Sequence, residues 1–80
     1  MIYNDDIRNR LRRIEGQARG VQRLLAEDAS CEAIITQLAA MKSALHHVGI
    51  EMIHCLLEGA GESPETVMEL ERTIRLLGKF

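Results

Sequence analysis

The stretch that decides the fold is residues 30–61, which read SCEAIITQLAAMKSALHHVGIEMIHCLLEGAG. Ser30 is a good helix N-cap and the glycines at the far end are typical of a helix stop, so one helix is expected from near Ser30 to Glu58. Apolar residues recur at spacings of three and four along its whole length, which indicates an amphipathic helix. They are Ile34, Leu38, Met41, Leu45, Val48, Met52 and Leu56, flanked by Ile35, Ile53 and Leu57.

Two further helices are expected on either side of this one. Upstream, residues 5–27 show the same apolar spacing, with Asn4 or Asp5 as N-cap and residues 27–30 as the turn. Downstream, Ser63 followed by Pro64 predicts a helix start, and Gly78 predicts its end. The chain is therefore expected to be all-α and one domain over residues 1–80, with two long helices in a hairpin and a short C-terminal helix. The apolar stripes are Ile7, Leu11, Ile14, Ala18, Val21 and Leu25, and then Val67, Leu70, Ile74 and Leu77.

The length of the middle helix predicts an assembly. A helix of about 28 residues is ~42 Å long. A compact monomer of this size has a radius of gyration near 12 Å and a width of only ~30 Å. Because the apolar stripe runs the full length and the first helix covers only part of it, we expect two hairpins to form an antiparallel four-helix bundle.

Composition excludes several classes of protein. The chain has 80 residues, 46% hydrophobic and 28% charged, which excludes disorder. It has no apolar run near the ~20 residues of a membrane span, and we expect a cytoplasmic protein without membrane partners. There is no CxxC, HExxH, GxSxG or phosphate-loop motif, and no nucleophile stands with a base. An enzyme is not expected.

Charge is distributed unevenly along the chain. Residues 8–23 hold six arginines against a single acid, Glu15, although the formal net charge of the whole chain is −2. An arginine-dense segment on an acidic protein suggests a surface that faces phosphate. The alternative is an ordinary solvated helix face.

Several segments together resemble one family. RLRRIEGQARG (residues 10–20) is followed by Cys31, by TQLAA (36–40) and by KSAL (42–45). This pattern, which covers most of the chain, resembles the CsoR/RcnR family of bacterial transcriptional repressors. The resemblance implies a dimer of hairpins that commonly pairs into a tetramer, and binding to operator DNA without a helix-turn-helix. The DNA-binding residues it implies are Arg10, Arg13, Gln17, Arg19 and Lys42, whereas Arg12 and Arg23 are expected only to be solvated.

The resemblance also implies an inducer site at Cys31, and this chain departs from the family there. Members respond to Cu(I), Ni(II) or Co(II), Zn(II), formaldehyde or persulfides, and place further ligands 25 and 29 residues after the first cysteine. Those positions here are Leu56 and Ala60, which cannot bind a metal. The site is expected to be non-standard, either for a transition metal or for a thiol-reactive inducer with no metal. By analogy with the family, Glu69 is an acid that would support it.

Two neighbouring side chains could substitute as ligands. At about 100° per residue, Cys31 and position 56 lie on the same flank of the helix. Cys55 lies on the opposite flank and His54 points away from the stripe. This geometry opposes a place for Cys55 and His54 in the family site unless the helix rotates or bulges. Cys31, Cys55 and His54 are still the candidate metal ligands, and the simpler reading of Cys55 is a small buried thiol. A second candidate set, on the polar face, is His47, Glu51, His54 and Glu58, for which a solvated surface or an ordinary tetramer interface is the simpler reading.

Two functions remain open from the sequence. The first is a DNA-binding repressor of the CsoR/RcnR type, released from its operator when Cys31 senses the inducer. The second is a helical scaffold, or a paralogue that has lost sensing and acts through protein partners. Salt-dependent binding to DNA would distinguish the two.

Overall fold

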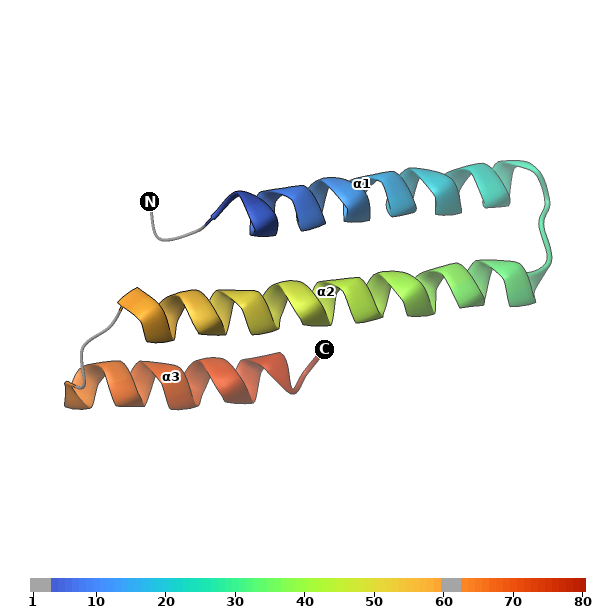
Figure 1. Cartoon of the computed structure of the whole chain (residues 1–80). Coiled ribbons are helices and arrows are strands. Elements are labelled where there is room, and N and C mark those ends of the chain that lie inside the picture. The colour runs from blue at the N-terminus through green and yellow to red at the C-terminus, as the bar shows by residue number, and fades with distance from the viewer. Residues whose placement is uncertain (1–3, 60–62) are drawn as a thin grey trace.

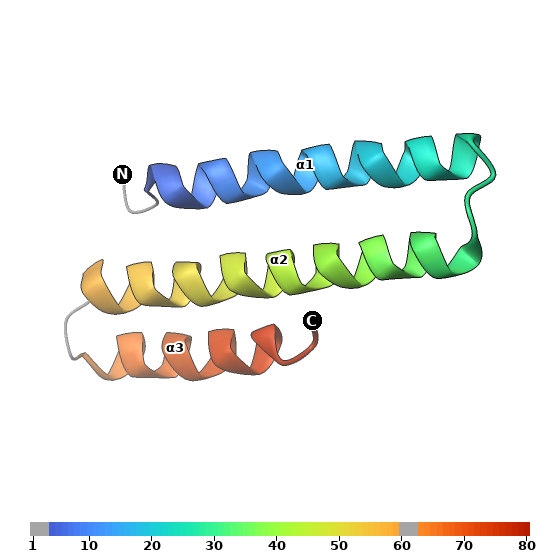
Figure 2. The same ribbon diagram turned by 45° about the vertical axis from the view of Figure 1, so that its right-hand side comes forward.

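Three antiparallel helices make up the computed structural model in Figure 1, which describes residues 4–59 and 63–80. The helices are α1 (Asp5–Ala26), α2 (Cys31–Gly59) and α3 (Pro64–Leu77). α2 lies in the middle with α1 on one side and α3 on the other, and the turned view in Figure 2 shows the same order. The expected all-α fold, a hairpin of long helices plus a short third helix, is confirmed.

Each helix begins at a side chain that caps its first turn. The backbone N–H of Ile7 donates to Asn4 Oδ1 at 3.0 Å, and that of Ala33 donates to Ser30 Oγ at 3.1 Å. In α3 the N–H of Thr66 donates to Ser63 Oγ at 3.2 Å. These bonds satisfy amide groups that have no partner within the helix. The predicted starts are confirmed, and of the two caps considered for α1 it is Asn4 that bonds.

The turn between α1 and α2 uses a left-handed residue that is not glycine. Asp28 has φ 53°, a region that L-residues seldom adopt. Around it, the N–H of Ala29 donates to the Leu24 carbonyl at 3.0 Å and that of Asp28 donates to Leu25 at 3.3 Å. This pair of bonds is a Schellman motif, which ends α1 and reverses the chain.

The core is small and lies between α1 and α2. Its buried members are Ile7 and Ile14 from α1 with Val48 and Cys55 from α2. Met41 and Ala44 are partly buried against them. Three other members of the α2 stripe stay exposed, Leu38 at 42%, Leu45 at 38% and Met52 at 39%. As expected, α1 covers only part of the apolar surface of α2.

α3 packs against the C-terminal half of α2 where a glycine allows close approach. A Cβ built on Gly49 would overlap the side chain of Leu77 and come within 3.9 Å of Phe80. The absence of a side chain at Gly49 therefore lets the end of α3 lie directly on α2.

The molecule is a flat layer one helix thick. Its Cα atoms extend over 52 × 24 × 11 Å, and the radius of gyration is 16.1 Å. A compact chain of this length would have a radius of gyration near 12 Å. Because a single layer leaves both faces of α2 open, each face is available for a partner.

Candidate nucleic-acid interface and thiol site

One face of the layer is apolar. Leu38 and Leu45 of α2 line an open cavity of about 410 Å³ with Phe80 from the end of the chain. Phe80 also lines the adjoining cavity of about 150 Å³, together with Met52 and Leu76. Large hydrophobic side chains from two helices thus form one continuous exposed surface. We call it the apolar face, and its residues are Leu38, Leu45, Met52, Leu76 and Phe80.

The opposite side of the α1–α2 pair carries a polar groove. At about 100° per residue, Ser43 and His47 point roughly opposite to Leu38 and Leu45 on α2. They line a hollow of about 260 Å³ together with three polar side chains of α1. We call this the polar groove, and its lining residues are Arg10, Arg13, Gln17, Ala40, Ser43, Ala44 and His47.

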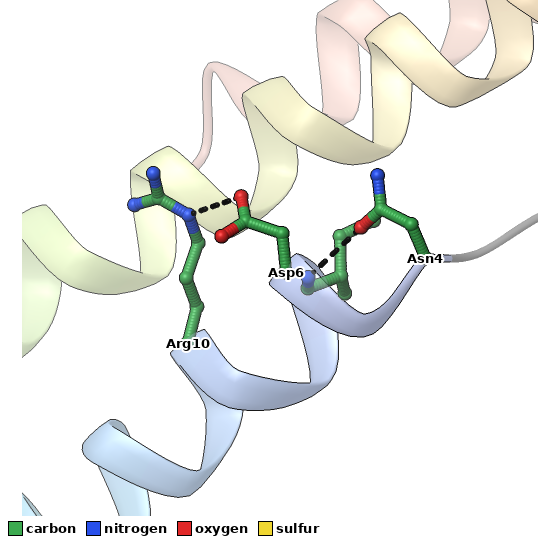
Figure 3. A network of polar contacts seen from close by, with 4 residues as sticks. Asn4, Asp6 and Arg10 are labelled. Carbon is green, nitrogen blue, oxygen red and sulfur yellow. Dashed lines mark hydrogen bonds and ion pairs between the residues drawn. The ribbon is translucent and has the colours of Figure 1, made fainter.

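Arg10 is oriented within the groove by an acid of its own helix. Its Nε donates to Asp6 Oδ2 at 3.2 Å across one helical turn. Figure 3 shows the two terminal guanidinium nitrogens on the side away from Asp6. The ion pair uses Nε and leaves the two terminal nitrogens, which Asp6 does not contact, as donors.

Gln17 brings an unpaired polar atom to the same groove. Its Oε1 atom is buried and has no hydrogen-bond partner. A buried polar atom without a partner is costly, and such atoms are often satisfied by a ligand or water. The groove thus combines two arginines with an amide that is free to bond a bound group.

The structure brings together three of the five residues expected to bind DNA and separates the other two. Arg19 points to the side of α1 opposite to Arg10, because nine residues at about 100° each amount to two and a half turns. Its side chain is 67% exposed and pairs with Glu15 at 3.8 Å. Lys42 lines the cavity of the apolar face, beside Phe80. Within one protomer, only Arg10, Arg13 and Gln17 share a surface.

The two cysteines have opposite surroundings. Cys31 is exposed and begins α2, whereas Cys55 is buried and belongs to the α1–α2 core. Both are free thiols. They lie 24 positions apart on one helix, so their separation is ~36 Å. One protomer therefore cannot use both for a single ion, and of the two readings of Cys55 its surroundings fit the small buried thiol.

The other candidate ligands do not gather around a metal within one protomer. His54 is exposed on the far side of α2 from Leu56, which is half-buried and has no donor atom. Over residues 4–59 and 63–80, no three His, Cys, Asp or Glu side chains stand close enough to hold an ion. This also leaves the His47, Glu51, His54 and Glu58 set without a site in the protomer, and Ala60 lies outside the described residues.

Glu69, expected to support the inducer site, is exposed on α3. Its backbone carbonyl accepts a hydrogen bond from Thr73 Oγ1 at 2.8 Å. This bond belongs to α3 itself and does not link Glu69 to Cys31.

The three-helix fold, the polar groove and the motif at residues 10–20 indicate one class of protein. The chain belongs to the metal-sensitive transcriptional repressor family, whose model matches residues 3–78. That family consists of repressors rather than enzymes, in agreement with the expectation from the sequence.

Two named relatives are similar to this chain. One is the copper-sensing transcriptional repressor CsoR of Bacillus subtilis, 34% identical over 73 residues, which are 82% of this chain and 72% of the relative. The other is the copper-sensing transcriptional repressor RicR of Mycobacterium tuberculosis, 38% identical over 63 residues, which are 72% of this chain and 66% of the relative. The comparison with solved structures gave no significant match. Among the described helices, none has the length and apolar character needed to cross a membrane.

Proposed function

We propose that this protein is an operator-binding repressor that contacts the DNA backbone through the polar groove. The observation that supports this most directly is the convergence of Arg10, Arg13 and Gln17 on one hollow between α1 and α2. Guanidinium groups bind phosphate oxygens in a planar, two-pronged geometry, and the Gln17 amide adds a further donor when it turns its NH₂ group toward the groove. Both relatives are named as transcriptional repressors.

A comparison of two double variants tests this proposal. Arg10→Ala with Arg13→Ala removes both groove arginines, whereas Arg12→Ala with Arg23→Ala removes the same charge from exposed positions outside the groove. Binding to a duplex from the protein's own promoter is measured by fluorescence anisotropy over a range of salt concentrations. Each lost phosphate contact lowers the slope of log affinity against log salt by about 0.9. We expect a marked loss of slope and affinity for the groove variant only.

Equal effects of the two double variants would contradict the assignment, because general charge and not the groove would then govern binding. Arg19 and Lys42 stay proposed contacts that act from other surfaces of the protomer. Single replacements of each by Ala should then weaken binding less than the groove variant does. No binding to the promoter duplex at any salt concentration would favour the alternative, a helical scaffold that acts through protein partners.

We place the second copy of the chain on the apolar face. That face exposes large hydrophobic side chains along α2 and the end of α3. Two layers stacked through it form the expected four-helix bundle of α1 and α2 pairs. Pairing of two such dimers into a tetramer remains an expectation from the family resemblance.

The proposed inducer site is Cys31, the exposed thiol at the start of α2. Cu(I) is the first metal to test because both relatives are named as copper-sensing. Ni(II), Zn(II) and persulfide are the alternatives. Since the residues that the structure describes do not gather a ligand set and Leu56 has no donor atom, we expect weak Cu(I) and Ni(II) binding and favour a thiol-based response at Cys31.

A further inference from the structure

We propose that His47 is a third cationic ligand for the DNA backbone in the polar groove, acting when its imidazole is protonated. This inference rests on the proposed DNA-binding function and adds to it a residue of α2 and a dependence on pH. His47 lines the groove from α2, opposite the two arginines of α1, so that a phosphate in the groove would meet donors from both helices.

Charged groups of both helices surround His47. The groups of α1 that face it across the groove are Arg10 and Arg13, with Asp6 bonded to Arg10 at 3.2 Å. On α2 the nearest ionisable neighbour one turn away is Glu51, which is half-buried. Arg10 and Arg13 are thus offset by Asp6 and Glu51, so that these four groups carry no net formal charge before DNA binds. A phosphate bound in the groove would add negative charge beside His47 and favour its imidazolium form.

The packing of the two helices explains why His47, and not its neighbour, has this place. His46 differs by about 100° around α2 and lines a separate hollow with Phe80 and Lys42. Ser43, one turn before His47, lines the groove and adds a hydroxyl donor. Gln17 lies across from them with its unpaired Oε1 atom. A glutamine amide can rotate to present its NH₂ group, so it also suits an anion held there.

Proton uptake on binding makes DNA affinity depend on pH. An imidazole changes its charge between about pH 5 and pH 8. One charge-assisted hydrogen bond would make phosphate bind the protonated form of His47 about tenfold more tightly than the neutral form. The affinity for DNA then rises about fourfold per groove as the pH falls from 7.5 to 6. The sign is fixed: affinity increases as pH falls, because the complex holds more protons than the free protein.

The test uses the full chain and its promoter duplex, with anisotropy measured at constant salt at about pH 6 and about pH 7.5. His47→Gln is compared with His46→Gln, a matched loss of one imidazole outside the groove. We expect the wild type and His46→Gln to bind more tightly at the lower pH, and His47→Gln to lose that gain. His47→Lys, which keeps its charge at both values, should bind tightly at both. Circular dichroism checks that each variant is helical.

Each outcome bears on one of the two proposals. A pH response that persists in His47→Gln, or that disappears equally in His46→Gln, overturns the role of His47. A wild type that binds DNA with no pH response overturns it as well, while the groove assignment stands. A wild type that does not bind the duplex removes the proposed function itself. An unrelated duplex of equal length should show the same pH response, because backbone contacts do not read sequence.

Discussion

At the scale of single residues, identical side chains acquire different roles from their surroundings. Cys31 and Cys55 are both free thiols on α2, yet one is exposed and the other is 6% exposed among Ile7, Ile14 and Val48. A thiol that solvent cannot reach reacts only when the core opens. His46 and His47 are both exposed, but only His47 lines the polar groove, whereas His46 lines another hollow.

We therefore predict that the two thiols differ strongly in reactivity. Cys31 should be modified much faster than Cys55 by an alkylating reagent in the folded protein, as followed by mass spectrometry of the two cysteine-containing peptides. Denaturant should remove most of the difference, because it exposes Cys55. The same spectra after exposure to Cu(I), Ni(II), Zn(II) or persulfide should show adducts that disappear in Cys31→Ala.

Two results would contradict this assignment. Equal labelling of the two thiols in the folded state would mean that Cys55 is not protected by the α1–α2 core. Tight stoichiometric Cu(I) binding that requires both cysteines would mean that a second protomer brings Cys55 to Cys31. Such a contact between Cys55 and Cys31 needs a rotation of α2 that exposes its buried side.

At the scale of elements, the space beside a helical glycine indicates how closely a neighbouring helix approaches. Gly49 lies where the end of α3 packs on α2, and a Cβ there would overlap the end of the Leu77 side chain. Gly20 of α1 has nothing within 4 Å of its Cβ position. Both are helical, so replacement by Ala has the same intrinsic benefit of about 1 kcal/mol at each.

The two Gly→Ala variants should accordingly differ in stability. Gly20→Ala should raise the free energy of unfolding by about 0.5–1 kcal/mol. Gly49→Ala should gain little or nothing, because Leu77 must leave its rotamer at a cost of about 0.5–1.5 kcal/mol. Urea unfolding at one protein concentration measures both. A gain at Gly49 equal to that at Gly20 would mean that α3 does not rest on α2 at this point.

The sequence predicted those features of the helices that depend only on neighbouring residues. Caps and turn residues act within a few positions, so Asn4, Ser30 and Ser63 located the helix starts correctly. Which side of α2 meets α1 is not local, because the apolar stripe of α2 is wider than one partner needs. The spacing of apolar residues along α2 therefore could not place His47 in the same groove as Arg10. Nor could it predict that Cys55 and Val48, rather than Leu45, would face α1.

At the scale of the whole molecule, the isolated chain exposes too much surface. Its solvent-accessible area is 6199 Å², whereas a compact monomer of 9.0 kDa has about 4,900 Å². The excess exceeds the ~800 Å² that each partner buries in an interface of standard size. Much of the exposed apolar area lies on one face, including Leu38, Leu45 and Met52, while the groove of Arg10 and Arg13 lies on the other. Stacking two copies through the apolar face would leave both grooves open to DNA.

A charge placed on the apolar face should separate the copies. We predict that Leu45→Lys converts a dimer or tetramer into monomers or unfolds it, because the lysines of both copies would be buried in the interface without partners at about 3–5 kcal/mol each. His54→Lys adds a charge at an exposed position of the same helix and should leave that dimer intact. Sedimentation velocity at micromolar concentration measures both, with circular dichroism recording helix content. The milder Leu45→Ala should keep its helices and raise the dissociation constant of the dimer. A well-folded wild-type monomer, or a Leu45→Lys variant that sediments like wild type, would show that the copies do not meet through this face.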